Sequence, residues 1–138
     1  DKKKYDSPLV FEYDGRVFLI GRRNVTDTGN YDLEQTELSI EQQSTINQLD
    51  YSDRPKRCSL WSIDRESLEV SFVIDLPSAG DTCFPEVVDL GKGRFLVFNY
   101  TSELEQESDP TWSTGQFEPT LIYHSILTIP VSISVEPQ

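Results

Sequence analysis

The chain has 138 residues, of which 36% are hydrophobic and 11% aromatic, enough apolar mass for one ordinary domain with its own core. Its formal net charge of −12 argues against binding to nucleic acid or to anionic membrane surfaces, because both demand clustered lysines and arginines. The sequence contains no apolar run long enough to span a bilayer, so we expect no membrane insertion.

The first half of the chain predicts four antiparallel strands and one long insertion. Asp14-Gly15 is a strong hairpin signal between the first two strands. Residues 24–56 are an acidic insertion that we interpret as a long loop, although residues 38–49 could make one or two helical turns. The predicted strands lie at residues 9–13, 16–21, 58–63 and 68–74, and a turn at residues 77–81 closes the unit.

The second half repeats this order. Gly91-Lys92-Gly93 is the turn between its first two strands, and residues 101–118 are a second acidic insertion. Pro130 ends the third strand, and the alternating residues 131–135 predict an outer or edge strand. The other predicted strands lie at residues 86–90, 94–100 and 120–129.

One segment occurs twice, because residues 7–20 return as residues 83–98 at an offset of 77 to 78 residues. A β-hairpin unit repeated at long period is typical of a β-propeller. We therefore predict an all-β chain made of two four-stranded antiparallel blades, residues 1–80 and residues 81–138. The alternative is a β-sandwich of about seven strands.

Two blades cannot close a propeller, and they leave open sheet faces and edges. The chain also begins at Asp1 rather than at a methionine. We therefore expect a processed chain or a fragment that contacts another protein chain or further blades.

Cysteines and sequons favour a secreted or lumenal protein. Cys58 and Cys83 can form one disulfide that would join the two blades, and the alternative is two buried unpaired cysteines. Asn24-Val25-Thr26 and Asn99-Tyr100-Thr101 both fit the acceptor pattern for N-linked glycans, which makes Asn24 and Asn99 candidate glycosylation sites.

No motif predicts a metal ion, a cofactor or a catalytic triad. The two cysteines lack the spacing of a zinc site, and His124 lies inside a strand, where a half-buried structural histidine is expected. Arg22 follows one strand end and Arg57 begins another strand, so both could bind a carboxylate if these ends converge on one rim. The alternative is that they are surface arginines that balance the acidic insertion.

Residues 77–85 (PSAGDTCFP), the strand end at Gly21-Arg22 and the strand that begins at Arg57 together resemble the C-terminal blades of sialidase-like propellers. The resemblance implies a six-bladed propeller whose other blades lie N-terminal to Asp1. It also implies an arginine triad for a sugar carboxylate, to which Arg22 or Arg57 would contribute, and it places Asp81 and Phe84 in the substrate-binding region. Phe84 stands where the family has its nucleophilic tyrosine, and a phenyl ring has no oxygen to attack the sugar.

The resulting hypothesis is a secreted sialidase-like segment that binds a glycan, such as an acidic sugar, or another protein, without hydrolase activity of its own. One alternative is a part of an active glycoside hydrolase whose remaining catalytic residues lie in other blades. Another is a structural or adhesive β-domain with no sugar pocket. We expect no cofactor in any of the three cases.

Overall fold

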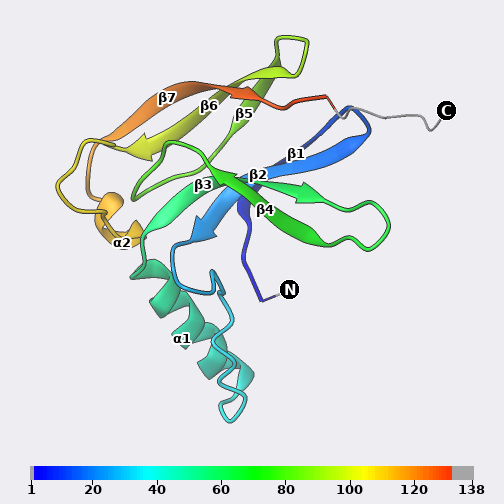
Figure 1. Cartoon of the computed structure of the whole chain (residues 1–138). Helices are drawn as coiled ribbons and strands as arrows, with labels where there is room; N and C mark the ends of the chain where they lie inside the picture. Colours follow the sequence, from blue (N-terminus) through cyan, green and yellow to red (C-terminus); the bar gives the residue numbers. More distant parts are fainter. Residues whose placement is uncertain (1, 132–138) are drawn as a thin grey trace.

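The computed structural model describes residues 2–131, and within this range the chain forms seven strands and two helices (Figure 1). In chain order these are β1 (Asp6–Tyr13), β2 (Arg16–Asn24), α1 (Ile40–Ser52), β3 (Lys56–Ile63), β4 (Val70–Asp75), β5 (Glu86–Asp89), β6 (Arg94–Ser102), α2 (Trp112–Gly115) and β7 (Thr120–Thr128). None of the helices in this range is long and apolar enough to cross a membrane.

The strands form two antiparallel sheets, so the chain is mostly β, as predicted. Two packed antiparallel sheets are common to the predicted pair of blades and to the alternative β-sandwich. Sheet 1 has the order β1-β2-β3-β4 and sheet 2 the order β5-β6-β7. Each sheet is therefore a meander of consecutive strands, whereas an immunoglobulin-type sandwich exchanges strands between its sheets. Sheet 2 has three strands where four were predicted, and the edge strand expected at residues 131–135 lies, apart from Val131, outside the described residues.

Residues with positive φ form the turns of the β1–β2 and β5–β6 hairpins. Asp14 and Gly15 adopt φ values of 52° and 70°, the left-handed conformation that a two-residue hairpin turn requires at both positions. The connection between β5 and β6 is longer, with four residues (90–93), and Gly93 at its end adopts a φ of 74°. A Cβ on Gly93 would lie 2.2 Å from the carbonyl oxygen of Ile129 and 2.9 Å from the hydroxyl of Tyr13, so only glycine lets the two sheets approach here.

The core lies between the two sheets and draws on both. Its buried apolar members are Phe18, Ile20, Leu60, Leu76, Phe95, Val97 and Ile129, with the two cysteines. The ring of Phe95 in sheet 2 lies 5.2 Å from that of Phe11 and 5.3 Å from that of Tyr13, both in sheet 1. Cys58 of β3 and Cys83, just before β5, form the predicted disulfide, which therefore joins the two sheets.

The first insertion holds a helix, so our interpretation of residues 24–56 as a loop was wrong in part. Helix α1 begins at a capping box, in which Ser39 accepts from the Gln42 backbone and the Gln42 side chain accepts from the Ser39 backbone. Its apolar residues do not gather on one face: Ile40 and Leu49 are exposed, and Tyr51 is the large side chain that it buries. The helix is therefore held by its cap and by tertiary contacts rather than by an amphipathic stripe.

Both insertions leave from the same end of the sheets and pack against each other (Figure 1). The Trp112 backbone donates to the carbonyl of Arg54 at 3.0 Å, and the Ser113 hydroxyl donates to the carbonyl of Ser52 at 2.8 Å. Pro55 and Thr111 form a β-bridge between them. We call this end, where β2 and β6 end and the two insertions meet, the insertion rim.

Candidate functional site

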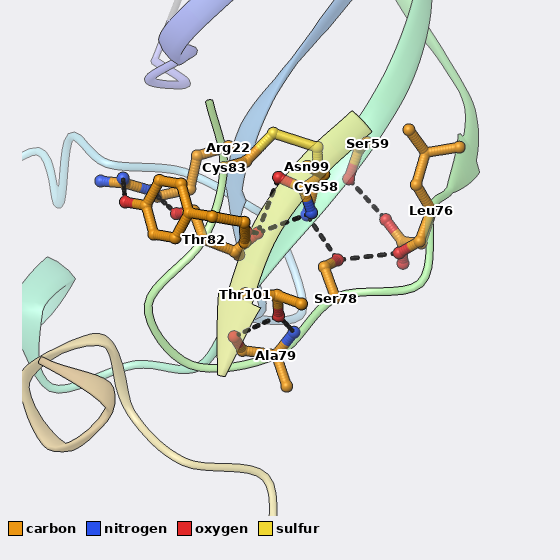
Figure 2. The surroundings of a disulfide bond; sticks show 12 residues. Arg22, Cys58, Ser59, Leu76, Ser78, Ala79, Thr82, Cys83, Asn99 and Thr101 are labelled. Carbon is orange, nitrogen blue, oxygen red and sulfur yellow. Dashed lines mark hydrogen bonds between the residues drawn. A yellow bond between two sulfur atoms is a disulfide. The ribbon is translucent and has the colours of Figure 1, made fainter. Parts of the chain in front are cut away.

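A buried guanidinium organises the insertion rim. Arg22 lies near the end of β2, opposite Asp6 of β1, and is 5% exposed. Its Nη1 lies 3.7 Å from Asp6 Oδ2, and its Nη2 donates to the Tyr100 hydroxyl at 3.3 Å. Its Nε donates to the Thr82 carbonyl oxygen, next to the disulfide (Figure 2). Every nitrogen of this side chain therefore faces a partner within the chain.

A second carboxylate, that of Asp81, also lies at this cluster and contacts Tyr100. Asp81 Oδ1 accepts a hydrogen bond from the Tyr100 hydroxyl and another from Trp112 Nε1, each at 3.1 Å. Trp112 belongs to α2 in the second insertion, and its ring lies 5.3 Å from the Arg22 guanidinium carbon. Asp81 Oδ2 receives no hydrogen bond from residues 2–131.

The two tyrosines near Arg22, Tyr100 and Tyr51, both donate hydrogen bonds to carboxylates. Burial raises the pKa of Tyr100 to about 12; the charge of Arg22 lowers it and that of Asp81 raises it, and burial prevails. Burial likewise raises the pKa of Tyr51, whose hydroxyl donates to Asp6 Oδ2 at 2.9 Å. Both phenols therefore stay protonated at neutral pH.

Phe84 is the exposed part of this cluster. Its ring is 63% exposed and stacks on Tyr100 with 5.4 Å between ring centroids and 25° between ring planes. Asp81 and Trp112 beside it are half-buried. The cluster thus combines an exposed aromatic ring with a half-buried carboxylate, and we call Asp81, Phe84, Tyr100 and Trp112 the Tyr100 site.

The structure brings three of the four predicted binding residues together and leaves the fourth apart. Arg22, Asp81 and Phe84 surround Tyr100, as described above. Arg57 pairs in register with Arg23, one residue beyond Arg22, so the two predicted arginines point to opposite faces of sheet 1. Arg57 forms a bidentate ion pair with Asp109 at 2.9 and 2.6 Å, so it contributes to the packing of the insertions.

The sequons do not provide accessible glycan acceptors in the folded chain. Asn24 is 2% exposed, its Nδ2 donates to the Asn30 carbonyl at 3.0 Å, and its Oδ1 accepts from Lys56 Nζ at 3.1 Å. Asn99 is 5% exposed and its Nδ2 donates to Thr82 Oγ1 at 3.1 Å. A glycan on either nitrogen would displace these contacts, so the prediction of two glycosylation sites does not fit this packing.

The predicted role of His124 also needs correction, because this side chain is exposed on β7, next to Phe98, rather than half-buried. Within residues 2–131 no cluster of three or more histidines, cysteines or carboxylates could hold a metal ion.

Sequence reasoning missed Tyr100, Trp112 and Asp6. Tyr100 carried a signal, since it lies 78 residues after Arg22 and so occupies the matching position of the repeat. Trp112 and Asp6 carried none, because the loop that places the first and the strand register that places the second are long-range features.

Comparison with known proteins gives no further guide to the site. No family model, no curated protein and no solved structure matches this chain.

Proposed function

We propose that this chain is a two-blade segment of a secreted β-propeller that binds a neutral glycan at the Tyr100 site and does not hydrolyse it. The observation that carries the proposal is the exposed Phe84 ring stacked on Tyr100, beside a carboxylate oxygen of Asp81 with no hydrogen bond from the described residues.

This pairing suits the chemistry of a sugar. A pyranose ring has an apolar face of C–H groups that packs on an aromatic ring, and hydroxyl groups at its edge that donate to a carboxylate. Phe84 supplies the first surface and Asp81 Oδ2 supplies the second. Tyr100 and Trp112 hold Asp81 in place through its other oxygen, so little side-chain entropy is lost on binding.

The burial and internal hydrogen bonds of Arg22 favour a neutral sugar over an acidic one. The side chain of Arg22 is 7% exposed and already has Asp6, Thr82 and Tyr100 as partners. A sugar carboxylate would also meet Asp81 and would be repelled by it.

The absence of hydrolysis follows from the same groups. Phe84 has no nucleophilic oxygen, and the Tyr100 hydroxyl, with its pKa raised to about 12, is held as a donor to Asp81. Asp6, the other carboxylate near Arg22, is occupied by Arg22, Tyr51 and Lys4.

The propeller and secretion are supported by the fold. Each sheet is a meander of consecutive strands, and the two pack face to face as neighbouring blades do. The Cys58–Cys83 disulfide is typical of an oxidising compartment.

Binding of the protein to an array of neutral and sialylated oligosaccharides, followed by calorimetry on the strongest neutral one, tests the proposal. We expect Phe84→Ala to weaken binding about 10-fold through the lost stacking, and Asp81→Asn to weaken it roughly 10- to 100-fold through the lost charge-assisted hydrogen bonds. Leu68→Ala, in the β3–β4 turn, and Asp89→Asn, at the end of β5, are matched controls at the opposite end of the sheets, and they should bind as the wild type does.

Binding to sialylated glycans alone, or binding that both site variants retain, would contradict the proposed site. Release of a fluorogenic sialoside by the wild type that persists in Phe84→Ala would contradict the absence of hydrolysis.

A further inference from the structure

Sheet 2 has a second apolar face that none of the described residues covers. Val87, Phe95 and Val97 face sheet 1 in the core. On the opposite face, Val88, Leu96 and Ile126 form one row across the three strands. The exposed apolar side chains of this face are Val88 (49%), Leu90 (48%), Phe98 (38%), Ile122 (79%) and Ile126 (49%).

The size of this face is that of an interface. At roughly 170 Å² for a fully exposed large apolar side chain, these five expose about 450 Å². A stable interface buries about 800 Å² per partner and is a little over half apolar. The face therefore supplies the apolar part of one standard interface.

The repeat shows which kind of surface fits on it. Phe11 and Phe18 of sheet 1 pack against sheet 2, and they correspond in the repeat to Val88 and Leu96. These two lie on the exposed face of sheet 2 rather than on its core face. Matching faces of the two sheets therefore point in the same direction. We call these faces face A; face A contains Phe18 in sheet 1 and Leu96 in sheet 2. The opposite face of each sheet is face B.

Within the chain, face A of sheet 1 packs on face B of sheet 2. We therefore expect face A of sheet 2 to pack against face B of another antiparallel sheet. The chain carries such a surface on sheet 1, where Val10, Leu19, Trp61 and Phe72 form one row across all four strands. Val10 (57%) and Phe72 (51%) on the two edge strands are exposed. Leu19 (8%) and Trp61 (1%) between them are buried, and the Tyr5 ring packs on Trp61 at 5.1 Å.

Face B of sheet 1 also offers a recess beside the N-terminal segment. A pocket of about 220 Å³ opens over Trp61 and Phe72 and gives a recess for a protruding apolar side chain. Lys3, Lys4 and Arg23 line this pocket together with Asp27. Arg23 already pairs with Asp75 and Lys4 with Asp6, so the recess offers shape rather than unpaired charge.

From this geometry we propose that the protein assembles with copies of itself, head to tail, with face A of sheet 2 in one copy packed on face B of sheet 1 in the next. Such a contact is heterologous, so it forms a closed ring or an open filament. Every copy adds two sheets, and propellers close with about four to eight, so a ring would contain two to four copies. This inference does not depend on the glycan site, but the number of copies rests on the proposed propeller; failure of glycan binding would therefore leave it standing.

The mass of the protein in solution, measured by light scattering and sedimentation across a concentration series, tests the proposal. We expect the wild type to reach a closed assembly of two to four copies. Ile122→Asp disables face A and Phe72→Asp disables face B, and each should be monomeric, with association weakened roughly 100-fold or more because an unpaired carboxylate would be buried. Both positions are at least half exposed in the single chain, and circular dichroism verifies that each variant folds.

An equimolar mixture of the two variants distinguishes head-to-tail contacts from other arrangements. Ile122→Asp keeps face B and Phe72→Asp keeps face A, so the mixture should form a one-to-one dimer and nothing larger. Leu68→Asp, an exposed apolar position in the β3–β4 turn, is the control and should assemble as the wild type does. A wild type that stays monomeric, a Phe72→Asp variant that still assembles, or a mixture that stays monomeric would each overturn the proposal.

Discussion

Replacing Lys56 with methionine is expected to change how the stability of the fold depends on pH. The Lys56 side chain is completely buried, and its Nζ donates to Asn24 Oδ1 and to the backbone carbonyls of Tyr51 and Arg54. These acceptors favour the ammonium form. Burial and, after it, the charge of Arg22 prevail and lower the pKa of Lys56 from 10.5 to about 7.

The sign of the effect follows from this lowered pKa. Between about pH 7 and pH 10.5 the unfolded chain keeps the Lys56 proton and the folded chain loses it. The free energy of unfolding therefore rises with pH across this window. For a folded-state pKa of about 7, this one group adds about 2 kcal/mol of stability between pH 7 and pH 9.

Urea unfolding of the wild type and of Lys56→Met at several pH values from 7 to 9 measures this contribution. Methionine does not titrate, so the difference between the two free energies of unfolding should grow by about 2 kcal/mol in favour of the wild type. The variant should be less stable at every pH, because Asn24 Oδ1 and two carbonyls lose their donor. Lys92→Met, at an exposed lysine in the β5–β6 turn, is the matched control and should follow the wild-type profile. Equal slopes in the wild type and Lys56→Met would refute the reasoning, because Lys56 would then keep its proton throughout.

Two further predictions concern the junction between the sheets. Replacing both Cys58 and Cys83 with alanine should lower the free energy of unfolding by about 3.5 kcal/mol, the loop-closure contribution for a separation of 25 residues; urea unfolding checks this, and reduction of the wild type should cause a similar loss. Gly93→Ala should lose considerably more stability than Gly91→Ala, because both glycines have positive φ but only Gly93 has an atom, the Ile129 carbonyl oxygen, in the way of a Cβ. Thermal unfolding of the pair compares them, and equal losses would mean that the backbone conformation alone accounts for the cost.

The strands could be predicted because their signals are local. Period-two alternation and turn residues place β2 at residues 16–21 and β6 at residues 94–100, and the structure has Arg16–Asn24 and Arg94–Ser102. Both extensions lie at the insertion rim, where polar residues such as Asn24 and Ser102 continue the ladder and interrupt the apolar pattern. Helix α1 lacked such a signal, because its apolar residues are spread around it and its one large buried side chain, Tyr51, is held by distant groups.

The site could be predicted only where the repeat or the resemblance marked it. Arg22, Asp81 and Phe84 were singled out in this way. Their common neighbour Tyr100 was missed although it matches Arg22 in the repeat, because an arginine and a tyrosine share no side-chain chemistry that would mark the correspondence. The sequons show the limit of a local pattern, and glycosylation at Asn24 and Asn99 stays a prediction that the packing does not favour. The tripeptide pattern is local and does not record that Asn24 and Asn99 are buried between long-range partners.

The correspondence between the two copies of the repeat connects the Tyr100 site to the proposed assembly. Arg22 and Tyr100 are matching positions of the repeat, and Arg22 is buried because Thr82 and Tyr100 of the next sheet close over it. Tyr100 in turn stands at the rim end of face A, in register with the exposed Ile122. A meander packed on face A would place its own equivalent of residues 82–84 beside Tyr100 and would turn an open aromatic surface into a cleft between sheets. Hydrogen bonds to Asp81 are stronger where water is excluded, so the proposed contact between copies would also complete the proposed glycan site.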